Sequence, residues 1–162
     1  MPETITIRPT TPDDFAAVDA LLAESYPRLL KKDYPPSVMV TAVPVIARAR
    51  PELVSSGTYF IAEDDAGRAL GAGGWTRRRR RPFEADIRHL ATDWRHTRRG
   101  IARAILRHVF TTAEGAGVTQ FSCLATRTAV PFYRVMGFTE IGPAVIELGP
   151  GIDFLAVRME RR

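Results

Sequence analysis

The chain has 162 residues, of which 45% are hydrophobic, and a formal net charge of +5. This length and composition predict one packed domain and exclude an intrinsically disordered chain. The only cysteine, Cys123, excludes an internal disulfide, and its apolar strand pattern favours a buried, inert thiol. No run approaches the roughly 20 apolar residues of a membrane span, and residues 1–4 do not begin a signal peptide. We therefore expect a cytoplasmic protein that binds no membrane.

The positive charge is densest in five consecutive arginines at 77–81, which Pro82 closes. Strand-like segments flank this run, so a solvated hairpin loop is the simplest interpretation. A second interpretation is that the guanidinium groups attract a polyanionic cofactor or an acidic partner. Aromatic residues are not interleaved with the arginines as in proteins that bind single-stranded nucleic acid, and we expect no nucleic-acid partner.

Hydrophobic periodicity predicts a chain of alternating strands and helices. In the first half we expect a strand over 4–8, a helix after the Thr11-Pro12 cap, a second helical stretch over about 35–54 broken at Pro44 and Pro51, and a β-hairpin over 59–75. In the second half we expect strands over 84–92 and 120–125, helices over about 101–115 and around Tyr133, and a final strand pair over 145–148 and 154–159. The resulting order is β-α-α-β-β-β-α-β-α-β-β, which indicates an α/β (α+β) domain.

The segment 97–102 combines the features of an anion site. It follows the strand over 84–92 and precedes a helix whose apolar residues recur from Ile101 to Phe110. The first amides of a helix have no intrahelical acceptor, and the helix dipole adds positive charge there, so such a turn binds phosphate. Gly100 and Ala102 are small enough for a phosphate oxygen to approach the backbone. The segment matches neither G-x-x-x-x-G-K-[ST] nor G-x-G-x-x-G.

Together with the segment 126–138, this turn resembles the two cofactor motifs of the GNAT superfamily of N-acetyltransferases, which transfer an acetyl group from acetyl-CoA to an amine. The motif [RQ]-x-x-G-x-[GA] corresponds to 97–102, and N-x-x-A-x-x-x-Y-x-x-x-G-F corresponds to 126–138. Thr97 stands where the family usually has Arg or Gln, and Thr126 where it usually has Asn. The first departure is expected to weaken cofactor binding without abolishing it, because backbone amides hold most of the pyrophosphate.

The resemblance implies a single GNAT-like domain over residues 1–162, with a mixed, mostly antiparallel sheet of six to seven strands that splays beside residues 90–92 and has helices on both faces. It also implies acetyl-CoA as co-substrate, with the pantetheine amides paired to the backbone of this strand and a backbone amide near Leu90 polarising the thioester carbonyl. The residues expected at the cofactor are Leu90, Ala91, Thr92, Thr97, Arg98, Arg99, Gly100, Ile101, Ala102, Arg103, Thr126, Phe132 and Tyr133.

Acetyl transfer needs an acid for the departing thiolate and a base for the amine. The resemblance implies that Tyr133, a phenol with an ordinary pKa near 10, is the acid; the alternative is an aromatic ring that only packs on the sheet. For the base, Asp86 or Glu84 could draw a proton through water. The alternative is that these carboxylates pair with Arg88 or with the arginine run.

Side-chain alternation on the strand over 84–92 assigns its residues to two faces. One face carries Glu84, Asp86, Arg88 and Leu90, and the other carries Ile87, His89 and Ala91. This parity points His89 away from the reaction and predicts a hydrogen-bonded, structural histidine. No group of His, Cys, Asp and Glu has metal-ligand spacing, so no metal is expected.

The acceptor pocket is expected between the first two helices and the hairpin, with Tyr26, Tyr34, Trp75 and Phe83 as its aromatic wall, although such aromatics are as often core residues. We therefore predict acetyl transfer to a primary amine of a small molecule or peptide by direct attack. The alternatives are a catalytically weak module that senses acetyl-CoA and, less favoured, a basic nucleic-acid-binding protein. The sequence leaves a homodimer open.

Overall fold

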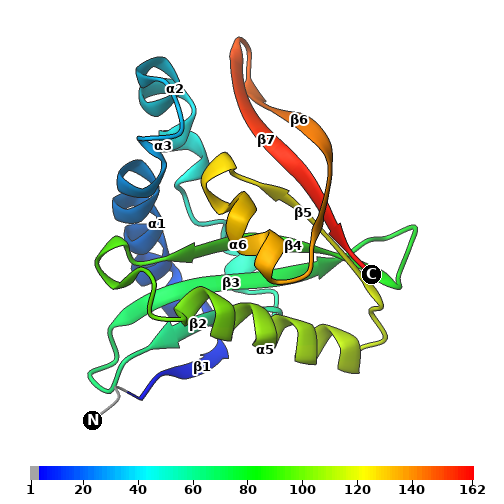
Figure 1. Cartoon of the computed structure of the whole chain (residues 1–162). Helices are drawn as coiled ribbons and strands as arrows, with labels where there is room; N and C mark the ends of the chain where they lie inside the picture. The colour runs from blue at the N-terminus through cyan, green and yellow to red at the C-terminus, as the bar shows by residue number, and fades with distance from the viewer. Residues whose placement is uncertain (1–3) are drawn as a thin grey trace.

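The computed structural model describes residues 4–162, which form a seven-stranded sheet with helices on both faces (Figure 1). The strands are β1 (Thr6–Pro9), β2 (Tyr59–Glu63), β3 (Ala69–Arg77), β4 (Glu84–Thr92), β5 (Gln120–Ala125), β6 (Thr139–Gly149) and β7 (Ile152–Arg161). The helices are α1 (Phe15–Leu30), α2 (Pro36–Thr41), α3 (Val43–Ile46), α4 (Pro51–Val54), α5 (Ile101–Gly115) and α6 (Val130–Val135), with 3₁₀ turns η1 (Pro12–Asp14), η2 (Trp94–His96) and η3 (Arg127–Ala129).

The sheet opens between its two central strands. Its order is β1-β2-β3-β4-β5-β7-β6, and every neighbouring pair is antiparallel except β4 and β5. These two parallel strands pair only over residues 84–86 and 120–122, and beyond Asp86 they diverge. The predicted mixed, mostly antiparallel sheet is confirmed, and its opening lies beside residues 90–92 as expected.

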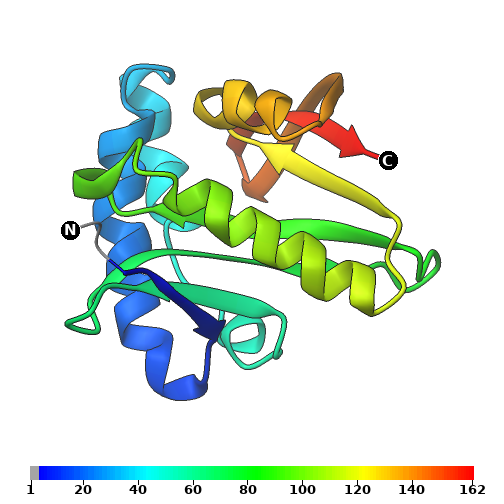
Figure 2. The same cartoon turned by 60° about the horizontal axis from the view of Figure 1, so that its bottom comes forward.

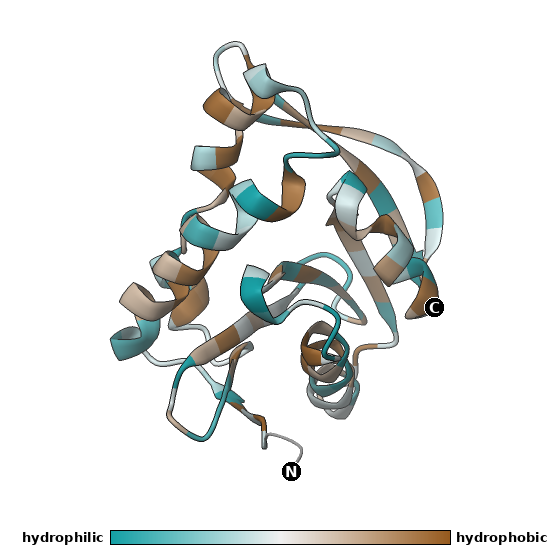
Figure 3. Ribbon diagram, turned by 60° about the vertical axis from the view of Figure 1, so that its left-hand side comes forward, coloured by the Kyte–Doolittle hydropathy of each residue, from teal (hydrophilic) through white to brown (hydrophobic). Residues whose placement is uncertain are grey.

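Both faces of the sheet centre are covered, which explains why β2 is apolar at consecutive positions. Phe60 and Ala62 belong to a core cluster with α5, whereas Tyr59 and Ile61 belong to a cluster with α1 and α4. Figure 2 shows α5 and α6 on one face and α1 on the other. In Figure 3, α5 is seen nearly along its axis and is hydrophobic on one side only, as expected for a helix that packs on a sheet.

Two predicted elements differ markedly from the observed ones, whereas the bounds of β1 and β7 differ from the expected ones by at most two residues. The predicted second helical stretch consists of three short helices, and Pro44 and Pro51 lie in the first turns of α3 and α4, where a missing amide costs no hydrogen bond. β6 begins at Thr139 rather than at 145, because its pairing with β7 continues to that residue. Its side chains are exposed or half-buried throughout, so hydrophobic alternation could not mark its start.

A β-bulge interrupts β4 at His89 and Leu90. Only Gly73 of β3 faces these two residues, because the register shifts there. His89 has a φ of 45°, in the left-handed region that non-glycine residues rarely adopt. The Tyr59 hydroxyl donates a 2.8 Å hydrogen bond to the His89 carbonyl and holds the bulge from below the sheet.

Beyond the bulge, the side chains of β4 point to the opposite face from the one that simple alternation predicts. Leu90 packs on the α5 side with Ile87, whereas Ala91 packs on the α1 side. The predicted alternation, which placed Leu90 with Arg88 and Ala91 with Ile87, is therefore wrong beyond Arg88. An extra residue in a strand shifts every later side chain to the opposite face.

Candidate active site

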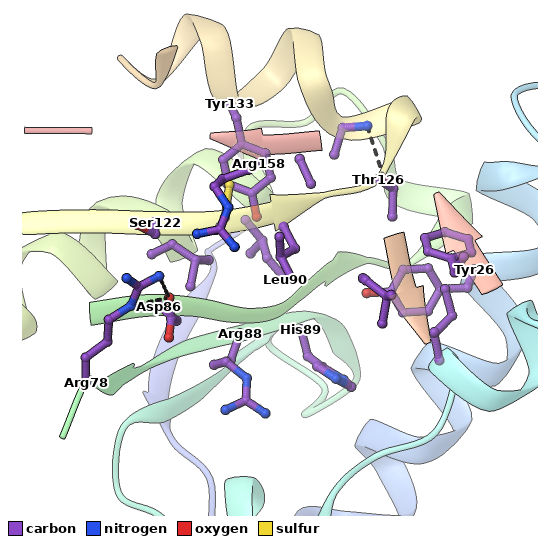
Figure 4. A pocket seen from close by; sticks show the side chains of 18 residues that line it. Tyr26, Arg78, Asp86, Arg88, His89, Leu90, Ser122, Thr126, Tyr133 and Arg158 are labelled. Carbon is purple, nitrogen blue, oxygen red and sulfur yellow. Dashed lines mark hydrogen bonds and ion pairs between the residues drawn. The ribbon is translucent and has the colours of Figure 1, made fainter. Parts of the chain in front are cut away.

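Two cavities meet at the opening between β4 and β5. One, of about 520 Å³, lies against the first turn of α5 and against α6; we call it the α5 cavity. The other, of about 400 Å³, lies between α1, α3 and strands β4, β5 and β7; we call it the arginine cavity because Arg78, Arg88 and Arg158 line it (Figure 4). The residues that line both are Tyr26, Leu90, Thr126, Ala129 and Tyr133. Ligands in the two cavities would therefore meet at a shared wall.

The α5 cavity contains a helix N-terminus suited to an anion. α5 begins after Gly100, which has a φ of 78°, and Arg98 has a φ of 62°. The first intrahelical bond runs from the Ala104 amide to the Gly100 carbonyl, so the amides of residues 101–103 have no intrahelical acceptor. Arg98 and Arg103 line the same cavity and add positive charge to that of the helix dipole.

The structure brings the predicted cofactor residues together at this cavity, with one exception. All of them line it except Arg99, whose Nη1 lies 3.2 Å from Nδ1 of His96 on an exposed turn. Thr126 caps η3, because its hydroxyl accepts a 3.2 Å hydrogen bond from the Ala129 amide. Threonine and the more usual asparagine are both good capping residues, which explains why this departure from the motif preserves the local fold.

Sequence reasoning missed the apolar part of this lining. Leu29, Leu30, Pro131, Val135 and Met136 also line the α5 cavity. They come from the end of α1 and from α6, which are about a hundred residues apart in the sequence. No local pattern indicates that these two helices face one cavity.

Tyr133 is buried and reaches both cavities. Its side chain packs edge-on against Phe132 and Phe138, with ring centroids 5.3 and 5.2 Å apart, and the residue is 6% exposed. Burial, reinforced by Cys123 and Tyr26, raises the pKa of Tyr133 well above its ordinary value of 10.0. The phenol is therefore protonated at neutral pH, and a weaker acid than its ordinary pKa suggests.

The two candidate carboxylates occupy different places. Asp86 lines the arginine cavity, and its Oδ1 accepts hydrogen bonds from Nη2 and Nε of Arg78 at 2.9 and 3.1 Å. Glu84 is 7% exposed, accepts from Arg78 at 3.2 Å and Arg81 at 3.3 Å, and lines neither cavity. Glu84 therefore stabilises the arginine loop, and the structure does not place it where a base would act.

His89 lines the arginine cavity, and its Nδ1 is buried without a hydrogen-bond partner. The prediction of a hydrogen-bonded, structural histidine is wrong, because the bulge redirects the strand at this residue. Burial, reinforced by the positive charges of Arg50 and Arg88, lowers the pKa of His89 to about 4, so the ring is neutral at pH 7. The glycines of β3, which lies opposite, could have predicted the bulge, since glycine in a strand often marks a bulge or a close approach. A Cβ on Gly73 would lie 2.6 Å from the Leu90 side chain.

Of the four aromatic residues expected at the acceptor, Tyr26 alone lines the α5 cavity or the arginine cavity. The Tyr34 hydroxyl bonds to backbone groups of β7 and η3 at 2.8 and 2.9 Å, which makes it a structural bridge. Trp75 is buried on the α5 side, where its Nε1 donates to the Thr112 hydroxyl at 3.1 Å. Phe83 is 46% exposed beside the arginine loop. Hydrophobicity alone did not separate core and loop aromatics from those of a pocket.

Two general features of residues 4–162 bear on function. None of their helices combines the length and the apolar character needed to cross a bilayer. Within the same residues, no three side chains of His, Cys, Asp or Glu converge as metal ligands.

The fold is shared with solved acetyltransferases. A GCN5-related N-acetyltransferase from Rhodopseudomonas palustris superposes with a TM-score of 0.79 at 20% identity, over 98% of this chain and 95% of that one. PaiA N-acetyltransferase from Thermoplasma acidophilum, solved with coenzyme A, gives a TM-score of 0.72 at 16% identity over 98% and 99% of the two chains. Diaminobutyrate acetyltransferase EctA from Paenibacillus lautus, solved with L-2,4-diaminobutyric acid and coenzyme A, gives 0.70 at 18% identity over 98% and 93%.

No curated protein sequence matches the chain. A family model described as an acetyltransferase (GNAT) domain matches residues 31–161. That match covers most of the chain, and the cofactor that defines such domains, acetyl-CoA, agrees with the anion site at the start of α5. The chain therefore belongs to the GNAT family of acetyltransferases.

Proposed function

We propose that this protein transfers the acetyl group of acetyl-CoA to a primary amine of a small molecule or peptide, by direct attack of the amine on the thioester. The observation that carries the proposal is the pair of cavities that share Tyr133 and Leu90 at the opening of the sheet. The α5 cavity suits the cofactor, and the arginine cavity leaves room for an acceptor on the opposite side of the same wall.

The residues of the α5 cavity fit acetyl-CoA. The first amides of α5 and the guanidinium groups of Arg98 and Arg103 suit the pyrophosphate. A Cβ on Gly100 would meet no atom within 4 Å, so the loop leaves open space for a phosphate. The apolar surface from Phe132, Val135 and Met136 suits the pantetheine arm, and the unpaired half of β4 offers backbone groups to its amides. When bound, acetyl-CoA supplies the acetyl group as a reactive thioester.

We assign the acid role to Tyr133 and the polarisation of the carbonyl to a backbone amide near Leu90. The Tyr133 hydroxyl donates to no other group of the described chain, so it is available to donate toward the leaving sulfur. Its raised pKa keeps that proton in place throughout the neutral range. As negative charge develops on the sulfur, a donated hydrogen bond stabilises it more than it stabilises the ground state.

We assign the removal of the amine proton to Asp86, acting through water. Both contacts from Arg78 reach Oδ1 of Asp86, which leaves Oδ2 able to accept a hydrogen bond from a water molecule in the arginine cavity. Arg78 holds the carboxylate at the cavity wall. Glu84 has no such access, because it lines neither cavity and its two carboxylate oxygens accept hydrogen bonds from Arg78 and Arg81.

The test is an acetyl-transfer assay with a panel of primary amines. Release of the coenzyme A thiol measures the rate, and mass spectrometry identifies the acetylated product. The proposal expects acetylated amine for at least one acceptor class. Binding of acetyl-CoA without transfer to any amine would overturn it and favour the sensor alternative.

The cofactor end of the proposal is tested by a matched pair of variants, Gly100→Asn and Gly100→Asp. Both residues tolerate a positive φ better than other side chains, so they differ mainly in charge. We expect Gly100→Asp to weaken acetyl-CoA binding in calorimetry by on the order of tenfold or more relative to Gly100→Asn, because it places a negative charge beside the phosphates. Equal affinities would place the pyrophosphate elsewhere.

A further inference from the structure

The arginine cavity carries more positive than negative charge. Among the described residues that line it are three arginines and a single carboxylate, Asp86. In Figure 4 the Arg158 side chain lies beside β5, Arg78 reaches Asp86 of β4, and the Arg88 guanidinium lies on the side of β4 away from β5.

Negative charge in and around the cavity converges on one of these arginines. Arg78 donates to Asp86 at 2.9 and 3.1 Å and to Glu84 at 3.2 Å. Together with Glu160, these carboxylates raise the pKa of Arg78. The charge of Arg78 is thus already matched by protein groups.

Arg88 and Arg158 are not matched in this way. Within residues 4–162, the Arg88 guanidinium makes one hydrogen bond, to the neutral Thr76 hydroxyl at 3.3 Å. The Arg158 guanidinium forms neither an ion pair nor a hydrogen bond with the described part of the chain. Arg88 is half-buried in the sheet, where a positive charge without a counter-ion is unfavourable. Two guanidinium groups without a counter-ion in one cavity suit an anionic ligand, because each planar guanidinium can donate two parallel hydrogen bonds to a carboxylate.

The rest of the cavity lining is largely apolar. It includes Ile46, Leu124, Ile146 and Phe154. A ligand that satisfies both parts has an acidic group and a hydrocarbon body. A second amine on the acceptor would instead be repelled by the uncompensated arginines.

We propose that the acceptor is a primary amine that also carries a carboxylate, as in an amino acid with an apolar side chain, and that Arg88 and Arg158 bind this carboxylate. The inference rests on the proposed function and specifies the substrate class of the same site. It makes Arg88 and Arg158 the residues that select the acceptor, while Tyr133 and Asp86 act on the reacting groups.

The experiment compares matched acceptors that differ in the carboxylate. L-Leucine and L-phenylalanine are assayed beside L-leucinamide and L-phenylalaninamide, which lack the carboxylate. Putrescine is included as an acceptor with a second amine, and O-phosphoethanolamine as an acceptor with a phosphate. We expect higher kcat/KM for the amino acids than for the amides, although the less basic amine of an amide is more often neutral. Higher kcat/KM for the amides or for putrescine would overturn the proposal. Higher kcat/KM for O-phosphoethanolamine would also overturn it, by showing that the acceptor carries a phosphate and not a carboxylate.

Variants connect the preference to the two arginines. Arg88→Gln and Arg158→Gln are each expected to lower kcat/KM for L-leucine by about 10- to 100-fold, mostly through KM, which is the range for losing a hydrogen bond to a charged group. The value for L-leucinamide should stay within about twofold in both. Arg68→Gln is the control, because Arg68 is exposed on the β2–β3 turn and lines neither cavity. An equal effect on leucine and leucinamide would show that the arginines act only on the fold.

Calorimetry separates failure of this inference from failure of the proposed function. L-Leucine is titrated into the wild-type protein and the Arg88→Gln variant, each saturated with coenzyme A. If no amine is acetylated but the variant binds L-leucine at least tenfold more weakly, the acceptor class stands and the transferase activity does not. If leucinamide and putrescine are acetylated while the variant binds L-leucine as tightly as the wild type, the transferase stands and the acceptor class does not.

Discussion

The ring of Tyr133 is packed as a core residue, while its hydroxyl has no hydrogen-bond partner among residues 4–162. Packing against Phe132 and Phe138 fixes the ring, and a fixed donor loses little entropy when it acts on a developing charge. Burial raises the pKa of Tyr133, so the hydroxyl stays protonated at neutral pH and can donate a hydrogen bond to the developing thiolate, but it releases the proton less readily than an ordinary phenol.

The first prediction concerns Tyr133→Phe. The variant keeps the ring and removes only the hydroxyl, so acetyl-CoA affinity and the free energy of unfolding should be unchanged. We expect kcat to fall by on the order of 10²-fold, the scale for losing one positioned acid. Steady-state kinetics and calorimetry measure the two effects. Wild-type turnover in this variant, with chemistry shown to limit the rate, would assign the proton to water and leave Tyr133 a packing role.

His89 predicts a pH effect on stability whose sign follows from its pKa. The pKa is about 4 in the folded protein and about 6.5 in an unfolded chain, so between these values the unfolded state binds more protons. The free energy of unfolding therefore falls as the pH drops from about 6.5 towards 4, and this contribution is constant above that window. Asp14, whose pKa Arg8 holds near 2, contributes a separate loss of stability as the pH falls from the ordinary aspartate pKa of 3.8 towards 2, below the window of His89.

The second prediction is that His89→Gln loses less stability than the wild-type protein between pH 7 and pH 5. Urea denaturation at both values gives the comparison, and NMR titration of the wild-type imidazole should show no protonation of His89 above about pH 5. A histidine signal assigned to His89 that titrates near pH 6.5 would contradict both the burial and the neutral state inferred here.

At the scale of elements, β3 explains how α5 comes close enough to the sheet to place its N-terminus at the opening. A Cβ on Gly71 would lie 2.9 Å from Ile105 of α5, and one on Gly74 would lie 2.3 Å from the Thr58 carbonyl oxygen. Gly71 thus allows α5 to pack closely on the sheet, and Gly74 allows β3 to approach the backbone of residues 58 and 59.

The third prediction compares Gly74→Ala with Gly115→Ala. Both changes lower the entropy of the unfolded chain equally, but only the first forces a methyl group into the backbone of β2. We expect Gly74→Ala to lower the free energy of unfolding by at least about 1–3 kcal/mol. Gly115 is the last residue of α5 and has no atom within 4 Å of its would-be Cβ, so its substitution should be neutral or stabilise by about 0.5–1 kcal/mol. Urea denaturation checks both, and equal stabilities would mean that β2 and β3 are less tightly packed than described.

The elements that sequence predicted well are those whose signal is local. The bounds of β4 and the start of α5 follow from alternation, a small turn residue and helical spacing, all within a few positions. The bulge at His89 depends on which strand lies opposite, and that information is not local. For this reason the orientation of His89 was predicted incorrectly while the strand that contains it was predicted correctly.

At the scale of the whole molecule, the α5 cavity was largely predictable and the arginine cavity was not. Most of the former comes from two motifs with fixed spacing. The latter combines residues of α1, α3, β4, β5 and β7, and Arg158 reaches it only because β7 pairs with β5. Long-range pairing of this kind leaves no trace in hydrophobic periodicity, so an exposed arginine near the end of the chain gave no reason to expect it at the acceptor.

The joined cavities also predict the order of events in catalysis. Because Tyr133 and Leu90 belong to both walls, cofactor and acceptor are expected to be bound together, and no acetylated enzyme is needed between them. Cys123, the only thiol in the chain, is buried, and burial, reinforced by the Asp86 charge, raises its pKa to about 12, so it holds almost no thiolate at neutral pH.

The last prediction is therefore that initial velocities follow a sequential pattern. Double-reciprocal plots against acetyl-CoA at several acceptor concentrations should intersect, and mass spectrometry of the protein incubated with acetyl-CoA alone should show no acetyl group on Cys123. Parallel lines together with an acetylated enzyme would establish a two-step route through a covalent intermediate. In that case the shared wall would serve to pass the acetyl group from one cavity to the other, and the direct attack proposed here would be wrong.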